Sequence, residues 1–292
     1  MRILVTGGSG FLGGYVLREA VSRGHETIAL ARSEAAARSV TADGARPIAG
    51  DLDQVRRLDE AFIAAQADAL VCLASLGRGH GPAMVAAAEE AGIPRAVFVS
   101  TTAVTTTLDP PTKRVRLAAE QQIRASGLDW TILRPTMIYG APGDRNLSRL
   151  LVLLHRTPVL PVPAVAACLH QPVHVADVAT AVLDALLAPA ATGAMYNVAG
   201  PEPIPFAELL RTCARVVRSR TRMVHVPLTP LVTLARGYEL VSRHPRLRVE
   251  QLLRLGEDKA FGIDDAVRDL GYAPRRFDDG IEAEARLLGL AP

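Results

Sequence analysis

A glycine-rich turn between a strand and a helix, at the very start of the chain, constrains the fold more than any other feature. Arg2–Thr6 has the continuous apolar pattern of a buried strand, and Phe11–Ser22 has the pattern of a helix. The residues that join them, Thr6–Gly13, are Thr-Gly-Gly-Ser-Gly-Phe-Leu-Gly. This arrangement predicts the first strand–helix unit of a parallel sheet.

Each glycine of this turn has a distinct steric use. Gly7 permits the tight turn, Gly10 lets the backbone approach a bound group, and Gly13 lets the helix pack closely on the sheet. The free N–H groups and the positive end of the helix then favour a pyrophosphate. The turn therefore predicts a dinucleotide site, although such a turn can also be purely structural. The predicted cofactor-binding residues of the turn are Gly7, Ser9, Gly10, Phe11, Leu12 and Gly13.

Short apolar strands alternate with helices over roughly the first half of the chain. The other predicted strands are Glu26–Ala31, Arg46–Gly50, Ala69–Ala74, Ala96–Thr101 and Trp130–Arg134. The predicted helices between them are Leu52–Gln66, Gly81–Ala91 and Arg114–Ser126. Strands that are apolar throughout, separated by helices, are typical of a parallel sheet covered on both faces. We therefore expect an α/β fold with a Rossmann-type, doubly wound sheet.

Beyond residue 140 the strand–helix alternation is lost and helices predominate. A helix over Val175–Leu187 and a strand over Ala194–Val198 are expected to return to the sheet. The later predicted helices are Phe206–Arg218, Thr229–Ser242, Arg248–Leu255 and Asp278–Leu288. The sequence thus predicts a dinucleotide-binding domain over 1–140, joined by about 175–198, and a small, mostly helical substrate lid over 141–174 and 199–292.

The end of the second predicted strand bears on the choice between NAD and NADP. Sites that prefer NAD place a carboxylate there, which accepts hydrogen bonds from the ribose 2′-hydroxyl. This strand ends Leu-Ala-Arg32-Ser33, and the first acid is Glu34. Arg32 could bind a 2′-phosphate with two N–H groups and Ser33 could add a hydroxyl, which favours NADP(H) over NAD(H). An ordinary solvated arginine is the alternative.

Composition excludes several classes of protein. The 292 residues are 49% hydrophobic, so a disordered chain is excluded. The 31 arginines and two lysines are nearly balanced by 30 acids, without a basic run, so no nucleic-acid partner is expected. Three scattered cysteines predict neither disulfides nor a metal site. Charges and prolines interrupt the most apolar stretch, Leu147–Leu169, so we expect no membrane partner and a cytoplasmic location.

Several further motifs resemble the short-chain dehydrogenase/reductase superfamily. These are the Thr6–Gly13 turn, Gly50-Asp51-Leu52, Ser100-Thr101-Thr102, Leu133-Arg134-Pro135, the segments 172–179 and 196–203, and the closing segments Glu257–Phe261 and Leu270–Tyr272. The likeness is to the extended and atypical branches, which include nucleotide-sugar epimerases, dehydratases and NAD(P)H-binding reductases. It extends over nearly the whole chain.

The resemblance assigns roles to residues at the ends of the predicted strands. By this likeness Asp51 and Leu52 flank the adenine, and Thr101 is the catalytic hydroxyl, with Thr102 a close second. Such a hydroxyl would donate a hydrogen bond to the substrate oxygen during hydride transfer. A strand end whose hydroxyls are satisfied internally is the structural alternative. The other positions implied to line the cofactor are Leu73, Ala74, Ser75, Ser100, Pro135 and Met137.

The chain departs from the superfamily at its acid/base pair, Tyr-x-x-x-Lys. The corresponding positions hold Thr112 and Arg116, and no tyrosine occurs between Tyr15 and Tyr139. Threonine is a poor proton donor beside a phenol, and arginine does not exchange protons near neutral pH. Lys113 is the one lysine close by, although its spacing does not match the motif. The proton donor stays open among Thr101, Thr102, Lys113, Tyr139, a lid residue, water and the substrate.

Three functions follow from these features. The first is an NADP(H)-dependent oxidoreductase that acts on a small carbonyl or hydroxyl compound, with Thr101, Thr102, Thr112, Lys113 and Arg116 as candidate catalytic residues. The second is an epimerase or dehydratase with a tightly held cofactor. The third is an NADP(H) sensor or assembly protein without catalysis. The expected partners are a small-molecule substrate and, as an open alternative, a second copy of the chain.

Asp144-Arg145-Asn146, after the sixth predicted strand, has two interpretations. These residues could recognise an anionic or hydroxylated substrate. Equally, Asp144 could cap the amino end of a helix.

Overall fold

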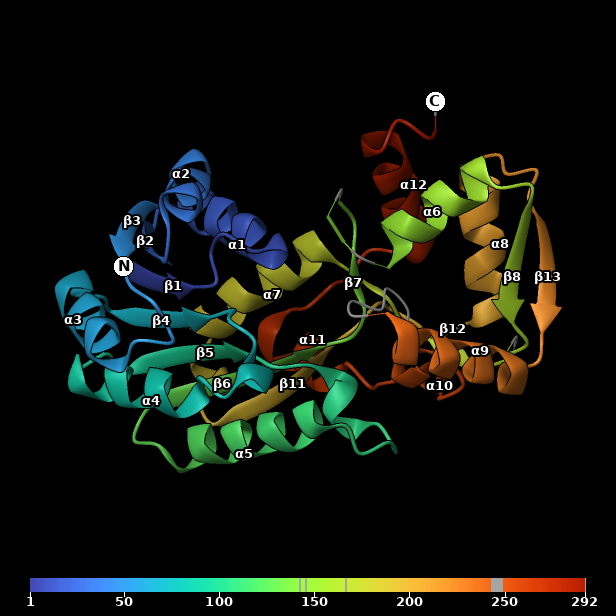
Figure 1. The fold of residues 1–292 in the computed structure, drawn as a ribbon. Coiled ribbons are helices and arrows are strands. Elements are labelled where there is room, and N and C mark those ends of the chain that lie inside the picture. The colour runs from blue at the N-terminus through green and yellow to red at the C-terminus, as the bar shows by residue number, and fades with distance from the viewer. Residues whose placement is uncertain (142, 145, 166, 243–248, 292) are drawn as a thin grey trace.

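The computed structural model describes residues 1–141, 143–144, 146–165, 167–242 and 249–291. Its centre is a sheet of seven parallel strands in the order β3-β2-β1-β4-β5-β6-β11 (Figure 1). The strands are β1 (Arg2–Thr6), β2 (Glu26–Ala31), β3 (Arg46–Ala49), β4 (Ala69–Cys72), β5 (Arg95–Val99), β6 (Asp129–Pro135) and β11 (Ala194–Val198). The order reverses between β1 and β4, which opens a crevice at their carboxyl ends.

Side chains on each strand alternate between two apolar cores, one on each face of the sheet. In β1, Ile3 and Val5 pack into one core, whereas Leu4 packs into the other. The first face carries α1 (Phe11–Ser22), α2 (Glu34–Ala42), α7 (Val175–Leu187) and α11 (Asp264–Leu270). The opposite face carries α3 (Val55–Ala65), α4 (Gly81–Glu90) and α5 (Pro111–Ala125) (Figure 1). The predicted doubly wound fold is therefore confirmed.

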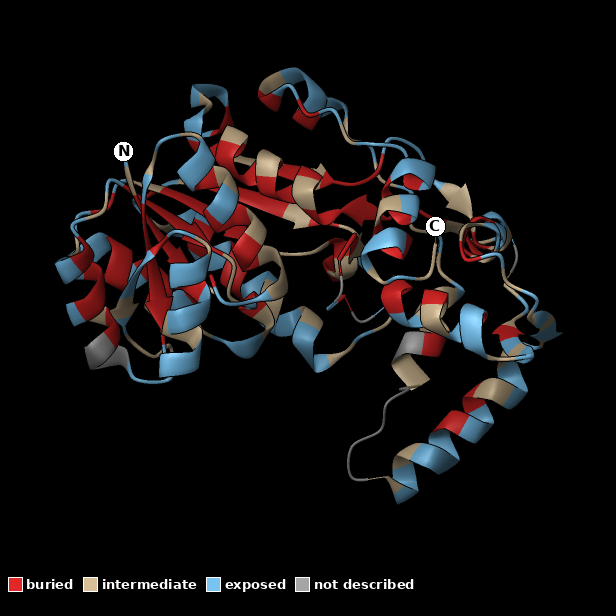
Figure 2. Cartoon of the chain, turned by 90° about the horizontal axis from the view of Figure 1, so that it is seen from above, coloured by how far each residue is buried: buried red, intermediate tan, exposed pale blue. Residues whose placement is uncertain are grey.

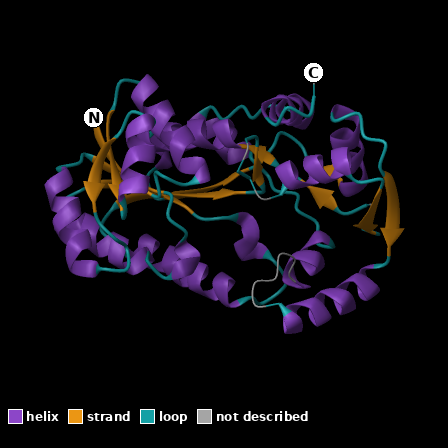
Figure 3. Ribbon diagram, turned by 45° about the horizontal axis from the view of Figure 1, so that its top comes forward, coloured by secondary structure: helices purple, strands orange, loops and turns teal. Residues whose placement is uncertain are grey.

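The remaining elements form a second, mostly helical layer beside the carboxyl edge of the sheet (Figures 1 and 3). Its helices are α6 (Leu147–Arg156), α8 (Phe206–Val216), α9 (Leu228–Val241), α10 (Val249–Leu255) and α12 (Phe277–Leu287). Three two-stranded ribbons join them: β7 (Ile138–Tyr139) with β10 (Val173–His174), β9 (Leu169–His170) with β12 (Ile204–Pro205), and β8 (Val159–Pro163) with β13 (Arg222–Val226). We call this layer the lid.

The lid has apolar cores of its own. Leu151, Leu209 and Ile281 bring α6, α8 and α12 together in the largest of them. A smaller core joins α9 to α10 through Val232, Ala235 and Leu252. Among the described residues, no helix is long and apolar enough to cross a membrane.

Part of the segment assigned to the lid packs instead on the sheet. Ala266 and Leu270 of α11, with Tyr272, lie in the same core as β1 and α7. The Tyr272 hydroxyl donates to the carbonyl of Ala199, 2.8 Å away. The Arg275 guanidinium pairs with Asp177 on α7 at 2.8 Å. Residues 263–275 therefore anchor the lid to the sheet.

Several element boundaries differ from the prediction for local physical reasons. Helix α5 begins at Pro111 rather than Arg114, because proline is compatible with the first turn of a helix. Helix α6 was not predicted, and the Asp144 carboxylate accepts from the Ser148 amide at its amino end at 3.2 Å, as the capping interpretation expects. Arg145 and Arg248, named in the predictions, lie outside the described residues.

Candidate functional site: a dinucleotide crevice

The glycine turn is closed tightly against the end of β4. Gly7 has φ +75°, and a Cβ there would lie 2.9 Å from the Ala74 nitrogen. A Cβ on Gly13 would lie only 2.2 Å from the carbonyl oxygen of Gly8. Any side chain at either position would therefore displace backbone, and Gly7 lies directly against Leu73 and Ala74, two of the residues predicted to line the cofactor.

The amino end of α1 offers unoccupied N–H groups to this crevice. Gly10 occupies the N-cap position, and no side chain in the described part of the chain caps the helix. Ser9 and Gly10 are exposed, and Phe11 and Leu12 are half-buried. Backbone N–H groups without a cap, at the positive end of a helix, are suited to a pyrophosphate.

A cavity of about 440 Å³ lies at the carboxyl end of β2, where the adenosine half of a dinucleotide would reach. Arg32 and Asp51 line it, beside the backbone of Gly50. Arg32 is exposed and forms no ion pair or hydrogen bond with a described residue. Glu60 also lines the cavity, so its walls carry both signs of charge.

Two residues predicted near the adenosine have structural contacts of their own. The Ser33 hydroxyl accepts from the Ala36 amide at 3.2 Å and thus caps α2. Its hydrogen is still available to a ligand oxygen. Leu52 packs against the apolar core beneath the sheet and is not among the residues that line the cavity.

Three hydroxyl side chains follow β5 in sequence, and they have different hydrogen-bond partners. The Thr102 hydroxyl donates to the carbonyl of Pro135 at 3.3 Å. The Thr101 oxygen accepts from the Ala103 amide at 3.2 Å, which leaves the hydroxyl hydrogen of Thr101 free to donate. The Ser100 oxygen is buried and has no partner among the described residues. Ser100 and Thr101 are therefore the hydroxyls that remain available at this strand end.

The residues at the Tyr-x-x-x-Lys positions, Thr112 and Arg116, and the nearby Lys113 lie in different surroundings. Thr112 is exposed in the first turn of α5. Lys113 is half-buried, and its ammonium group donates to the carbonyl of Thr106 at 2.5 Å. Arg116 lies against the turn after β4, where a Cβ on Gly77 would come within 2.9 Å of its guanidinium carbon. Arg116 thus lies against the turn after β4 and Lys113 against the segment after β5, both at the carboxyl edge of the sheet, whereas Thr112 is exposed.

Tyr139, the other phenol considered as a proton donor, is part of the lid core. It is 1% exposed and contacts the rings of His174 and Phe277 edge-on. Burial raises the pKa of its hydroxyl far above the ordinary value. Tyr139 is therefore a structural residue, and its phenol is excluded as the proton donor.

The other predicted cofactor positions lie at or just after the carboxyl ends of β4 and β6. Pro135 is buried at the end of β6, and Met137 packs against the lid core. The amide of Val173 donates to the carbonyl of Met137 at 3.0 Å. Ser75 is exposed just before the short 3₁₀ turn at Leu76–Arg78.

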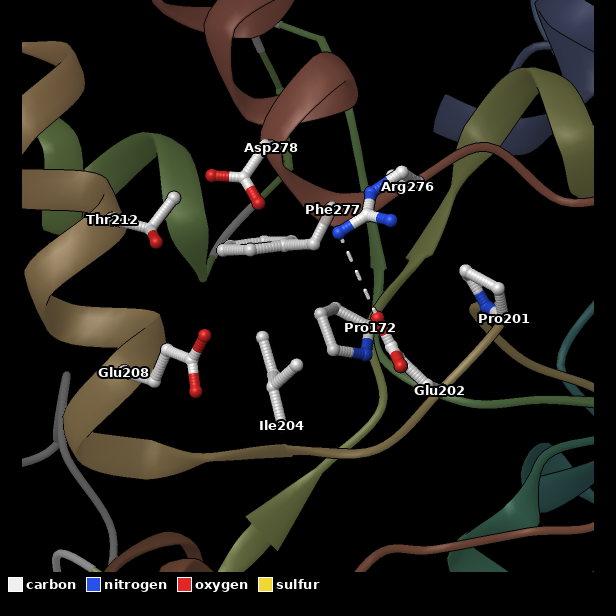
Figure 4. Close-up of a pocket in the computed structure, with 9 residues that line it drawn as sticks. All are labelled: Pro172, Pro201, Glu202, Ile204, Glu208, Thr212, Arg276, Phe277 and Asp278. Atoms are coloured by element: carbon white, nitrogen blue, oxygen red, sulfur yellow. Dashed lines mark ion pairs between the residues drawn. The ribbon is translucent and has the colours of Figure 1, made fainter.

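A second cavity lies within the lid (Figure 4). Its volume is about 40 Å³, which is room for water but not for a nicotinamide ring. Glu202, Glu208 and Asp278 surround it, and Arg276 pairs with Glu202 at 3.9 Å. Because these residues come from α8, α12 and their flanks, the cavity is separate from the glycine turn.

The glycine turn, the uncapped helix end and the cavity at β2 fit a nicotinamide dinucleotide in its extended form. A family model described as NAD(P)H-binding matches residues 7–189 of this chain. The chain belongs to the NAD(P)H-binding family. The matched range includes both the glycine turn and the strand ends described above, and the expected likeness to the extended short-chain dehydrogenases/reductases is confirmed.

Two relatives of similar length are reductases by name. A ketoreductase of 4-hydroxy-2-methyl-3-oxo-4-farnesyl-3,4-dihydroquinoline-1-oxide from Stigmatella aurantiaca is 30% identical, over 97% of this chain and 95% of that protein. An NAD(P)H azoreductase from Xenophilus azovorans is 26% identical, over 99% of this chain and 100% of the relative. These relatives support the general class of oxidoreductases.

The fold is shared with solved sugar-nucleotide enzymes. The UDP-glucose 4-epimerase of Thermus thermophilus, solved with NAD, has a TM-score of 0.75 and 20% identity, and the match covers 99% of each chain. At this identity the likeness concerns the fold alone.

Glu257, to which the sequence assigned no role beyond its closing segment, lies beside the threonines. The Glu257 carboxylate accepts from the Thr106 hydroxyl at 2.6 Å and from the Thr107 amide at 2.8 Å. No local pattern could reveal contacts between segments about 150 residues apart.

Proposed function

We propose that this protein is an NADP(H)-dependent oxidoreductase that reduces a carbonyl group of a small molecule, or oxidises the corresponding alcohol. The observation that carries the proposal is Arg32, exposed and without a partner among described residues, at the cavity where an adenosine ribose would lie. A guanidinium can hold a 2′-phosphate through two parallel N–H groups. The names of the two reductase relatives are consistent with the reaction type.

Some residues of this chain would bind the cofactor, and others would orient the substrate. Gly7, Gly10 and Gly13 shape the backbone around the pyrophosphate, and Arg32 selects the phosphorylated ribose. The bound cofactor supplies or accepts the hydride. The free hydroxyl hydrogen of Thr101 orients and polarises the substrate oxygen, where negative charge develops during reduction.

A proton must reach the substrate oxygen by another route than a phenol. Lys113 is held by the carbonyl oxygens of Thr106 and Leu108, at 2.5 and 3.4 Å. Thr102 is held by Pro135. We infer that water supplies the proton, through a hydrogen bond to the Thr101 hydroxyl.

An NADP(H)-binding protein without catalysis is the second candidate. It is favoured by the exposed Thr112, which stands where the superfamily has its tyrosine. The epimerase or dehydratase alternative has less support, because it requires a strong base at that position.

The proposal is tested by NADPH consumption with a panel of ketones, aldehydes and quinones. The wild type should turn over at least one of them, and Thr101→Val should lower kcat about a hundredfold with unchanged NADPH affinity. Thr101→Ser keeps the hydroxyl and should retain most activity. Thr105→Val is the matched control, because among the described residues the Thr105 hydroxyl donates only to the nearby Thr102 carbonyl. Tight NADPH binding without turnover of any compound would instead support the non-catalytic candidate.

A further inference from the structure

A short segment between α10 and α11 is fixed to the lid by hydrogen bonds. This segment is Gly256–Phe261, and we call it the strap. The Lys259 amide donates to the carbonyl of Leu169 in β9 at 2.8 Å. The Phe261 amide donates to the side-chain oxygen of Gln171 at 2.7 Å. The strap is therefore held in place by β9 and the residue that follows it.

The strap also contacts the segment that follows β5 of the sheet, through Glu257. The Glu257 carboxylate accepts from the Thr106 hydroxyl at 2.6 Å, and from the amide and the hydroxyl of Thr107 at 2.8 and 2.5 Å. Burial alone would raise the pKa of Glu257, but these hydrogen bonds and the nearby Lys259 outweigh it and hold the pKa below its ordinary value. Hydrogen bonds to an ionised acceptor are stronger than those between neutral groups. Glu257 thus holds two consecutive threonines from the lid.

Thr106 is one end of a hydrogen-bonded turn whose other end is Thr101. The Thr101 hydroxyl oxygen accepts from the Ala103 amide at 3.2 Å, and the Thr101 carbonyl accepts from the Val104 amide at 3.3 Å. The Thr106 amide in turn donates to the carbonyl of Ala103 at 3.4 Å. Because these bonds join the turn from end to end, we expect a displacement of Thr106 to reach Thr101.

Thr106 is held from two parts of the chain, α5 and the strap. From α5, the Lys113 ammonium group donates to the carbonyl oxygens of Thr106 and Leu108, at 2.5 and 3.4 Å. Among the described residues, the bonds from Thr106 and Thr107 to Glu257 are the hydrogen bonds that join this segment to the lid. The lid therefore acts on the segment through one carboxylate.

We propose that Glu257 is a positioning residue, which makes the orientation of the Thr101 hydroxyl depend on the docked lid. This inference rests on the proposed function, because Thr101 is the hydroxyl that orients the substrate oxygen there. A misplacement of about 1 Å in a reacting group can lower a rate constant about a hundredfold. Loss of the bonds to Glu257 should therefore lower kcat, although the residues that bind NADPH are unchanged.

Hydrogen exchange of single amides, followed by NMR, tests this coupling without a substrate. Glu257→Ala should accelerate exchange about tenfold or more at Thr107, which loses its acceptor, and also at Val104, whose amide bond lies within the turn. Glu257→Gln keeps an acceptor oxygen for Thr107 and should recover part of the protection. Glu250→Ala removes a carboxylate of α10 that pairs within that helix, and this matched control should leave both amides unchanged. Faster exchange at Thr107 with unchanged exchange at Val104 would overturn the coupling.

Kinetics with a substrate of the wild type separate positioning from a general loss of structure. Glu257→Ala should lower kcat about tenfold, while the KM for NADPH changes less than about twofold. In a Thr101→Val background Glu257→Ala should lower kcat no further, because its effect passes through the Thr101 hydroxyl. A further loss in that background, or an unchanged kcat in Glu257→Ala, would overturn the positioning role. Absence of turnover in the wild type would count against the proposed function alone, and exchange at Val104 would still decide whether Glu257 holds the turn.

Discussion

Burial, together with neighbouring charges, determines the pKa of individual side chains in this protein. Glu284, on α12, is fully buried and accepts from the Ser148 hydroxyl at 2.7 Å and from the Gly140 amide at 3.1 Å. Burial and the neighbouring Asp144 raise the pKa of Glu284 to about 8. The lid is therefore built around a carboxyl group that is neutral over much of the ordinary pH range.

This shift predicts that the lid loses stability as the pH rises. The folded pKa lies above the unfolded one, so the contribution of neutral Glu284 is complete below about pH 4.5 and is lost as the pH rises to about 8. Glu284→Gln cannot ionise and should show a flatter profile of Tm against pH between about 5 and 9. Parallel profiles for the two proteins would contradict the assignment.

The three cysteines should differ sharply in reactivity. Cys72 and Cys213 are fully buried, and burial raises the pKa of the Cys72 thiol to about 12 and that of Cys213 further still. Cys168 is partly exposed. Because the thiolate is the reactive form, we expect one thiol per chain to react with a maleimide in the native protein and three after unfolding. Rapid native labelling of Cys168→Ser would contradict this.

Among the connections between secondary-structure elements, the glycine turn between β1 and α1 tolerates substitution least. A Cβ on Gly13 would lie within 2.4 Å of two carbonyl oxygens, those of Gly7 and Gly8. Gly13→Ala should therefore destabilise the protein by about 3 kcal/mol in urea unfolding and abolish dinucleotide binding. Gly237, in α9, has open space around it, so Gly237→Ala should be neutral or stabilising by up to about 1 kcal/mol. Equal effects of the two substitutions would refute the steric account.

The elements predicted well from sequence are those with strong local patterns. All seven strands of the sheet and the helices α1, α7, α8, α9 and α12 appear within a few residues of their predicted positions. Helices α2 and α11 were missed because each is short and buries few residues, Val40 in α2 and Ala266 and Leu270 in α11. The glycine turn was found because its steric requirement is local. Contacts such as Glu257 with Thr106 depend on tertiary packing alone.

At the scale of the whole molecule, stability is distributed unevenly. The central strands β1, β4 and β5 are buried on both faces, whereas α9 buries only Val232 and Ala235 (Figure 2). Its Leu234, Leu240 and Val241 are 72%, 89% and 87% exposed. Few buried contacts imply a low local free energy of opening.

Hydrogen exchange should reveal this difference in local stability between the sheet and α9. We expect amides of α9 to exchange at least a hundredfold faster than those of β1 and β4, measured by mass spectrometry on peptides. Helix α8, whose Leu209 and Cys213 are buried in the lid core, serves as the reference within the lid. Protection of α9 equal to that of α8 would show that another contact covers its apolar side.

The central claim, a dinucleotide site that selects NADP(H) through Arg32, is tested most directly by calorimetry with NADPH and NADH. We expect NADPH to bind about ten to a hundred times more tightly than NADH in the wild type. Arg32→Ala should remove that preference, whereas Arg38→Ala, an exposed arginine that pairs with Glu34 on α2, should keep it. Equal affinity for the two cofactors in the wild type, or an unchanged preference in Arg32→Ala, would contradict the account.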